Sequence, residues 1–192
     1  MHAMNARRLL YALAALSVLW LGWAMLQPPP PLPDHGQPGA AGYRLAGHTI
    51  TPLEPFQLEA RVLGREDYRF DRGAQVSPTD LALGWGPMAD PQVLARIAIS
   101  QGNRWYRWRV EEFPIPRREI ETHSANMHLI PANAAVADAL AAVRPGQRIA
   151  LRGQLVEVKG DDGFRWLSSR TREDTGDGAC ELIWVEQLSR LD

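Results

Sequence analysis

The stretch His123–Pro131, with the sequence HSANMHLIP, gathers side chains that could bind a metal ion or carry protons. His123 and His128 are candidate metal ligands and candidate general bases. Their spacing sends them to opposite faces of a strand and about 140° apart around a helix. A metal site therefore requires a loop here, and the alternative is a polar loop in which Asn126 and the histidines cap backbone groups. We favour the polar loop, because no closely spaced pair of metal ligands accompanies the histidines.

Cys180 is the only cysteine of the chain, so it has no partner for an internal disulfide. A thiol nucleophile requires a neighbouring base and a lowered pKa. His123 or His128 could be that base only if the fold brings one of them to the thiol. The alternative is a buried cysteine that packs as a small apolar residue, and we favour it.

Asp174 begins the triplet DTG, which is also the triplet of aspartic proteases. Those enzymes need two carboxylates that share a proton, whereas this chain has one such triplet. A calcium loop from Asp174, Asp177 and Glu181 lacks the full alternating pattern of oxygen ligands. A glycine-rich turn between strands is therefore the favoured interpretation. The candidate catalytic residues are His123, His128, Asp174 and Cys180; no cofactor is predicted, and a metal ion at the histidines remains the alternative.

The segment Arg104–Arg109 (RWYRWR) interleaves basic and aromatic side chains. On a strand, Trp105 and Arg107 share one face, expected to be exposed, and Tyr106 and Trp108 share the other, expected in the core. Such a mixture can stack bases or sugars and hold anions. All acidic residues lie after residue 26, so this part of the chain is slightly acidic and nucleic acid is not the expected ligand. A protein partner, a glycan or an anionic ligand fits better, and a solvated basic face is the alternative.

Residues 9–26 are apolar and carry no charge, which predicts a transmembrane anchor. A helix of that length measures about 27 Å, close to the thickness of the hydrocarbon core of a bilayer. Arg7 and Arg8 precede it, which places residues 1–8 in the cytoplasm by the positive-inside rule. A cleaved signal peptide is the alternative, but bulky residues and a run of prolines follow the apolar segment instead of a small-residue cleavage site.

Residues 27–42 are rich in proline and glycine and are expected to form a stiff linker. Residues 43–192 then form a β-rich domain in the periplasm. The pattern of alternation and of turn residues predicts strands at Tyr43–Ile50, Phe56–Leu63, Asn103–Val110, Gln147–Lys159, Phe164–Ser168 and Glu181–Leu188. Residues 77–88 are expected to form a turn or short helix followed by an irregular segment.

Two helices are predicted from their capping residues, namely Pro91–Ile97 after Asp90 and Ala134–Val143 after Asn133. A change of phase beside Gly153 suggests a bulge, and Asp161-Asp162-Gly163 suggests a hairpin turn. The expected fold class is mainly β with minor α, a small OB-like barrel preceded by an N-terminal transmembrane helix.

Four stretches of the domain resemble a family of uncharacterised bacterial proteins with one N-terminal membrane segment. They are SPTDLALGWGPMAD (77–90), ISQGNRWYRW (99–108), HSANMHLIPAN (123–133) and SSRTREDTGDGACELIWV (168–185). The resemblance implies a shared fold and no established activity or cofactor. If the domain has one functional site, we expect it among the polar and aromatic residues of these stretches that packing alone does not explain. The candidate binding residues are Trp85, Trp105, Arg107, Asn126 and Arg170.

The expected function is that of a bitopic inner-membrane protein with a non-enzymatic binding or assembly domain in the periplasm, acting with a partner protein of the cell envelope. The absence of a complete catalytic set in the sequence favours this interpretation. A membrane-tethered hydrolase that depends on a metal or a thiol is the first alternative. An OB-like module that binds polyanions or nucleic acid is the second.

Overall fold

The computed structural model describes residues 11, 13–20, 22, 42–174, 176 and 178–191. The described residues before position 23 are helical. None of the described helices is both long and apolar enough to cross a membrane. The predicted anchor at residues 9–26 lies partly outside the described residues, and the predicted linker lies outside them up to residue 41.

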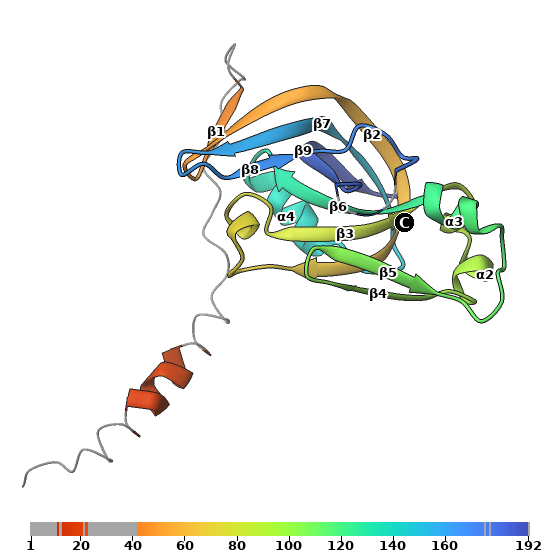
Figure 1. Cartoon of the computed structure of the whole chain (residues 1–192), viewed down its shortest axis with the longest axis horizontal. Helices are drawn as coiled ribbons and strands as arrows, with labels where there is room; N and C mark the ends of the chain where they lie inside the picture. Colours follow the sequence, from red (N-terminus) through yellow and green to blue (C-terminus); the bar gives the residue numbers. More distant parts are fainter. Residues whose placement is uncertain are drawn as a thin grey trace, which may run out of the picture. The chain divides into compact units, whose positions relative to one another are not determined.

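The C-terminal domain is mainly β with short helices, which confirms the predicted class (Figure 1). Its strands are β1 (Tyr43–Leu45), β2 (His48–Asp67), β3 (Thr79–Gly84), β4 (Ala98–Gly102), β5 (Trp105–Arg109), β6 (Ser124–Pro131), β7 (Arg148–Gly160), β8 (Arg165–Leu167) and β9 (Glu181–Arg190). The α-helices are α2 (Pro91–Leu94), α3 (Arg117–Thr122) and α4 (Ala134–Ala142), and the 3₁₀-helices are η1 (Arg72–Gln75) and η2 (Gly86–Ala89).

The strand pairings of the main sheet run in a cycle. The long strand β2 pairs with β3, β3 with β6, β6 with β9, β9 with β7, and β7 again with β2. The pairing of β6 with β9 is parallel, and the other four are antiparallel. Strands β1 and β8 add to β2 and β7, whereas β4 and β5 form a separate hairpin.

One core cluster takes residues from all five strands of this cycle, and in it Met127 and Leu129 of β6 pack with Leu81 and Leu83 of β3. A second cluster, which includes Trp184, uses the alternate residues of β6 and β9. Helix α4 contributes buried Val136, whose backbone N–H is capped by the Asn133 side chain at 3.0 Å, as predicted.

Strand β7 bends where a glycine permits it. A Cβ atom at Gly153 would lie 1.9 Å from the carbonyl oxygen of Trp184, so only glycine allows the two backbones to approach this closely. The register between β7 and β9 shifts at this residue, which confirms the predicted bulge. The predicted hairpin turn after β7 is also present, because β7 pairs with β8 across residues 161–163.

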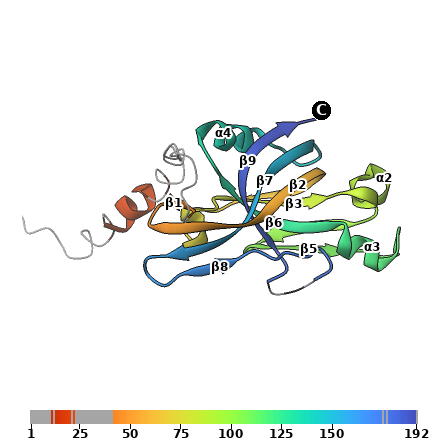
Figure 2. The same ribbon diagram turned by 90° about the horizontal axis from the view of Figure 1, so that it is seen from above.

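Two segments that were predicted to lack strands contain them. Residues 79–84 form β3, where a turn or short helix leading into an irregular segment was predicted, and every residue of this strand is buried. A strand buried on both faces lacks the alternation of polar and apolar residues that reveals a strand in the sequence. For the same reason Ser124–Pro131 is the buried strand β6 and not a loop. Figure 2 shows β6 beside β3, with β5 next to them.

Candidate functional site

The turn of the β4–β5 hairpin is formed by Asn103 and Arg104, which both have positive φ angles, of 54° and 66°. Such a two-residue turn matches the twist of a hairpin, but it strains a residue other than glycine or asparagine. The backbone of Arg104 is held on both sides. Its N–H donates to the Tyr68 hydroxyl at 2.8 Å, and its carbonyl accepts from the Asn126 side chain at 3.0 Å. Strand β5 therefore begins at Trp105 and not, as predicted, at Asn103.

The guanidinium of Arg104 is used inside the protein. It lies 2.7 Å from a carboxylate oxygen of Asp80 and 2.8 Å from one of Asp71, and it stacks on the ring of Tyr68 at 3.7 Å. The basic face expected of Arg104–Arg109 is therefore reduced to Arg107 and Arg109, which are exposed. Trp105 is exposed and Tyr106 and Trp108 are partly buried, as the alternation predicted.

Asp80 is fully buried, and its carboxylate contacts polar side chains of β6. The Asn126 side chain donates to it at 3.1 Å, and Nδ1 of His128 lies 2.9 Å from the same carboxylate oxygen. The His128 ring also packs against Trp166, with 4.5 Å between ring centroids. His128 therefore belongs to an internal polar network that joins β3, β6 and the hairpin.

His123 lies elsewhere, at the C-terminal end of α3. Its Nδ1 atom is 3.1 Å from a carboxylate oxygen of Glu119, and its ring lies against Trp85 and Gly86. Within the described ranges, no group of three or more His, Cys, Asp or Glu side chains could hold a metal ion. The two histidines thus do not form a common site.

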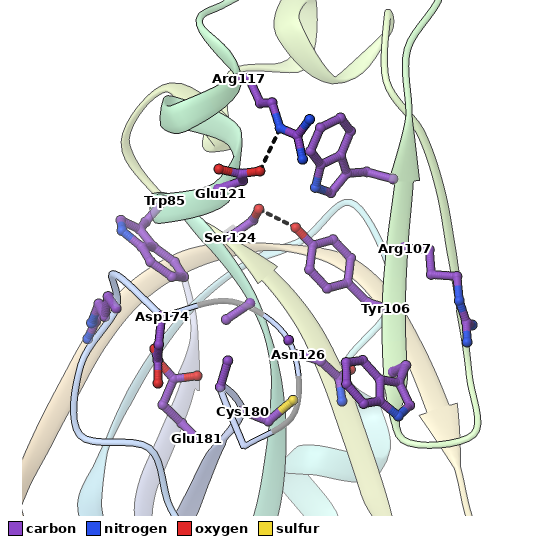
Figure 3. Close-up of a pocket in the computed structure, with 16 residues that line it drawn as sticks. Trp85, Tyr106, Arg107, Arg117, Glu121, Ser124, Asn126, Asp174, Cys180 and Glu181 are labelled. Carbon is purple, nitrogen blue, oxygen red and sulfur yellow. Dashed lines mark hydrogen bonds and ion pairs between the residues drawn. The ribbon is translucent and has the colours of Figure 1, made fainter.

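An open cavity of about 490 Å³ lies between β5 and the segment that precedes β9 (Figure 3). All four of the resembling stretches contribute to it. The first supplies Trp85, the second Trp105–Trp108, the third Ser124–Asn126, and the fourth residues between Arg172 and Glu181. Arg117 and Glu121 of α3, which form an ion pair at 2.7 Å, complete the lining.

The wall that precedes β9 carries the acidic groups of the cavity. Glu181 is only 2% exposed, and its Oε2 atom has no hydrogen-bond partner among the residues that the structure describes. Burial raises the pKa of Glu181 to about 7, although a hydrogen bond from its own backbone N–H and the charge of Arg172 oppose the shift. Asp174 accepts a hydrogen bond from the Ser169 hydroxyl at 2.7 Å. The cavity wall thus contains one buried carboxyl oxygen, Oε2 of Glu181, that has no hydrogen-bond partner among the described residues.

Arg172 lies near this carboxyl group but stacks on aromatic rings. Its guanidinium is 4.8 Å from the centroid of the Trp85 ring and 4.8 Å from that of the Phe56 ring. Burial lowers the pKa of Arg172. The guanidinium therefore contributes to the wall of the cavity as a flat surface between two rings.

Cys180 also lines the cavity, but its thiol is not activated. Burial, and then the carboxylates of Glu181, Asp80 and Asp174, raise the pKa of Cys180 to about 12. A nucleophilic cysteine needs the opposite shift, toward the thiolate at neutral pH.

Alkylation of Cys180 by iodoacetamide at pH 8 is expected to be about fiftyfold slower than alkylation of a free cysteine. The thiolate fraction falls tenfold for each pKa unit, and the greater nucleophilicity of a more basic thiolate offsets part of that loss. Mass spectrometry of the intact chain measures the rate, and the urea-unfolded chain is the control. Labelling of the folded chain as fast as of the unfolded chain would contradict the raised pKa.

The cavity unites six of the predicted site residues, namely Trp85, Trp105, Arg107, Asn126, Asp174 and Cys180. Three others do not line it. His123 and His128 have the separate settings described above, and Arg170 is exposed and pairs with Glu54 at 3.0 Å. Asp177 lies outside the described residues.

Sequence reasoning missed Arg172 and underrated Glu181. Glu181 was considered only as a calcium ligand, although a carboxyl group directly before the apolar run LIWV was a sign of burial. Tyr106 and Ser124 were also missed. Both line the cavity, and their hydroxyl oxygens lie 2.5 Å apart and join β5 to β6.

Comparisons with known proteins add little to this geometry. No family model matches the chain. No curated protein matches it either. A solved structure of the protein PriB from Ralstonia solanacearum is similar at 15% identity, over 73% of this chain and 99% of that chain, with a TM-score of 0.33. A likeness this slight has no bearing on fold or function.

Proposed function

We propose that this chain is a membrane-anchored binding or assembly domain of the periplasm, non-enzymatic, which holds an envelope partner in the cavity between β5 and residues 172–181. The observation that carries the proposal is the convergence of four separate stretches on one open cavity. Packing alone does not explain these side chains, because they combine four aromatic rings with a buried carboxyl group whose Oε2 atom has no hydrogen-bond partner among the described residues.

The composition of the cavity favours binding over catalysis. Its volume of about 490 Å³ is within the range of ligand sites, and rigid aromatic rings with a few placed polar groups are typical of them. The thiol of Cys180 has a raised pKa, which disfavours the alternative of a thiol-dependent hydrolase. The ion pairs of Arg104 with Asp80 and Asp71 weaken the alternative of a polyanion-binding face.

We further propose that the fold is a small OB-like barrel. The cycle of pairings through β2, β3, β6, β9 and β7 supports closure of the sheet. The position of α4 between β6 and β7 in the sequence, with its side chains in the core, agrees with such a barrel.

The location of the domain is part of the same proposal. The uncharged apolar run at residues 9–26, with Arg7 and Arg8 before it, supports a single-pass anchor in the inner membrane. The proline-rich residues 27–42 would then hold the domain away from the membrane surface on its periplasmic side.

Photo-crosslinking in living cells tests the binding site. The full chain is made with p-benzoylphenylalanine in place of Trp105, at the rim of the cavity, or in place of Leu167, a control on β8 that is 48% exposed. The expected result is a discrete adduct from position 105 and none from position 167, at equal amounts of the chain in the membrane. No adduct at position 105, or the same adduct at both positions, would contradict the proposal.

A further inference from the structure

One wall of the cavity is the edge of a strand. The four consecutive residues Trp105–Trp108 line it, although neighbouring side chains of a strand point to opposite faces. A cavity lined by all four residues must therefore lie along the edge of the strand and not over one of its faces. In the described part of the chain β5 pairs only with β4, so its edge toward the cavity has unpaired backbone N–H and C=O groups.

A second unpaired edge adjoins the first. Ser124–Asn126 of β6 also line the cavity consecutively. The pairing between β6 and β9 begins only at Met127, opposite Glu181. On that side, Ser124–Asn126 have no partner strand among the described residues. The cavity is thus bordered by two strand edges that could pair with an added strand.

The opposite wall presents the unpartnered carboxyl group. Figure 3 shows Asp174, Cys180 and Glu181 across the cavity from Tyr106. Arg172 acts on Glu181 through its charge more strongly than Asp174 does, but within the described ranges no ion pair joins the side chains of Arg172 and Glu181. The other charged residues of the lining are Arg107, which is exposed, and the mutually paired Arg117 and Glu121.

We infer that the occupant of the cavity is an extended segment of a partner protein, which adds as a strand along β5 and places a lysine or arginine side chain against Glu181. The inference rests on the proposed function and names the chemistry of its partner. Backbone pairing to an open edge gives affinity, and a side-chain pocket beside that edge gives specificity. A cationic group is the complement of a buried carboxyl group whose Oε2 atom has no hydrogen-bond partner among the described residues, and the surrounding rings favour it further.

Binding of a cation must ionise Glu181, so it is linked to proton release. Because the pKa of Glu181 is about 7, the carboxyl group is mostly neutral at pH 6 and mostly ionised at pH 8. Affinity for a cationic peptide should therefore rise about tenfold between these two pH values and then level off.

The test uses the full chain in lipid nanodiscs and two blocked pentapeptides, acetyl-Thr-Val-Lys-Val-Thr-amide and the same peptide with uncharged norleucine for lysine. Titration calorimetry at pH 6 and pH 8 measures binding to the wild-type chain and to Glu181→Gln. The lysine peptide is expected to bind the wild type about tenfold more tightly at pH 8 than at pH 6. The norleucine peptide, and the lysine peptide with Glu181→Gln, are expected to bind more weakly at pH 8 and without this pH dependence.

Three further results would overturn the inference. If the lysine and norleucine peptides bind equally to the wild-type chain and to Glu181→Gln, Glu181 does not bind the cationic side chain. Two further lysine peptides carry N-methyl groups, one on the odd-numbered and one on the even-numbered backbone amides, so that each lacks the hydrogen-bond donors of one strand edge. If both bind as tightly as the unmethylated peptide, the occupant does not add as a strand. Failure to bind any peptide also rejects the inference. The crosslinking test at position 105 is independent of these results, so failure of the proposed function would be recognised separately.

Discussion

Replacement of Glu181 by glutamine is expected to raise the free energy of unfolding at pH 8 by about 3 kcal/mol and to leave it nearly unchanged at pH 4. Burial raises the pKa of Glu181 from an ordinary 4.5 to about 7 in the folded chain. Between these two values the folded state holds a proton that the unfolded state has released. The contribution of Glu181 to the free energy of unfolding therefore falls by about 1.4 kcal/mol per pH unit from pH 4.5 to pH 7, and stays lowered above that.

Chemical denaturation of the full chain in detergent micelles, followed by circular dichroism at several pH values, measures this difference. Glutamine resembles the neutral carboxyl group in shape and lacks its titration. The control is Glu173→Gln in the same segment, whose side chain is 82% exposed, and it should change stability by less than about 0.5 kcal/mol. Equal pH profiles for wild type and Glu181→Gln would show that the carboxyl group is not buried as described.

Replacement of Arg104 by alanine is expected to lower the free energy of unfolding by about 3–5 kcal/mol. The fully buried Asp80 would lose the guanidinium that lies 2.7 Å from it, and would remain as a buried carboxylate without a cationic arginine. The same denaturation experiment measures the loss. Arg109→Ala, at an exposed position of the same hairpin, is the control and should have little effect.

A second substitution separates lost charge pairing from lost packing. In the Arg104→Ala background, Asp80→Asn removes the unpaired charge and should recover part of the stability, which a double-mutant cycle measures. A loss below about 1 kcal/mol in Arg104→Ala alone would contradict the importance of this network for the hairpin.

Local signals made several elements predictable from the sequence. Asp90 and Asn133 cap α2 and α4 through their own side chains, and each does so within three residues. Gly153 and the turn at residues 161–163 fix the course of β7 in the same local way. The two faces of β5 followed from alternation alone.

The other elements and the candidate site depend on contacts between residues far apart in the sequence, and no local sequence pattern reveals those contacts. Strands β3 and β6 are buried on both faces, so their polar residues suggested loops. Asp80, Arg104 and His128 are polar because they meet one another across the fold. His128 therefore resembled a candidate for catalysis or metal binding until its partners were known. The cavity, likewise, depends on four stretches that only the fold brings together.

Isotope-edited infrared spectroscopy of the Glu181 carboxyl group tests most directly whether the cavity offers an unpaired acid to a cationic partner. The full chain in nanodiscs carries ¹³C-labelled glutamate, and the spectrum of Glu181→Gln identifies the signal of this residue by difference. The binding-site proposal predicts a neutral carboxyl group at pH 6 that becomes a carboxylate when the lysine peptide is added, and that stays neutral with the norleucine peptide. A carboxylate at pH 6 before any peptide is added, or no response to the lysine peptide, would contradict it.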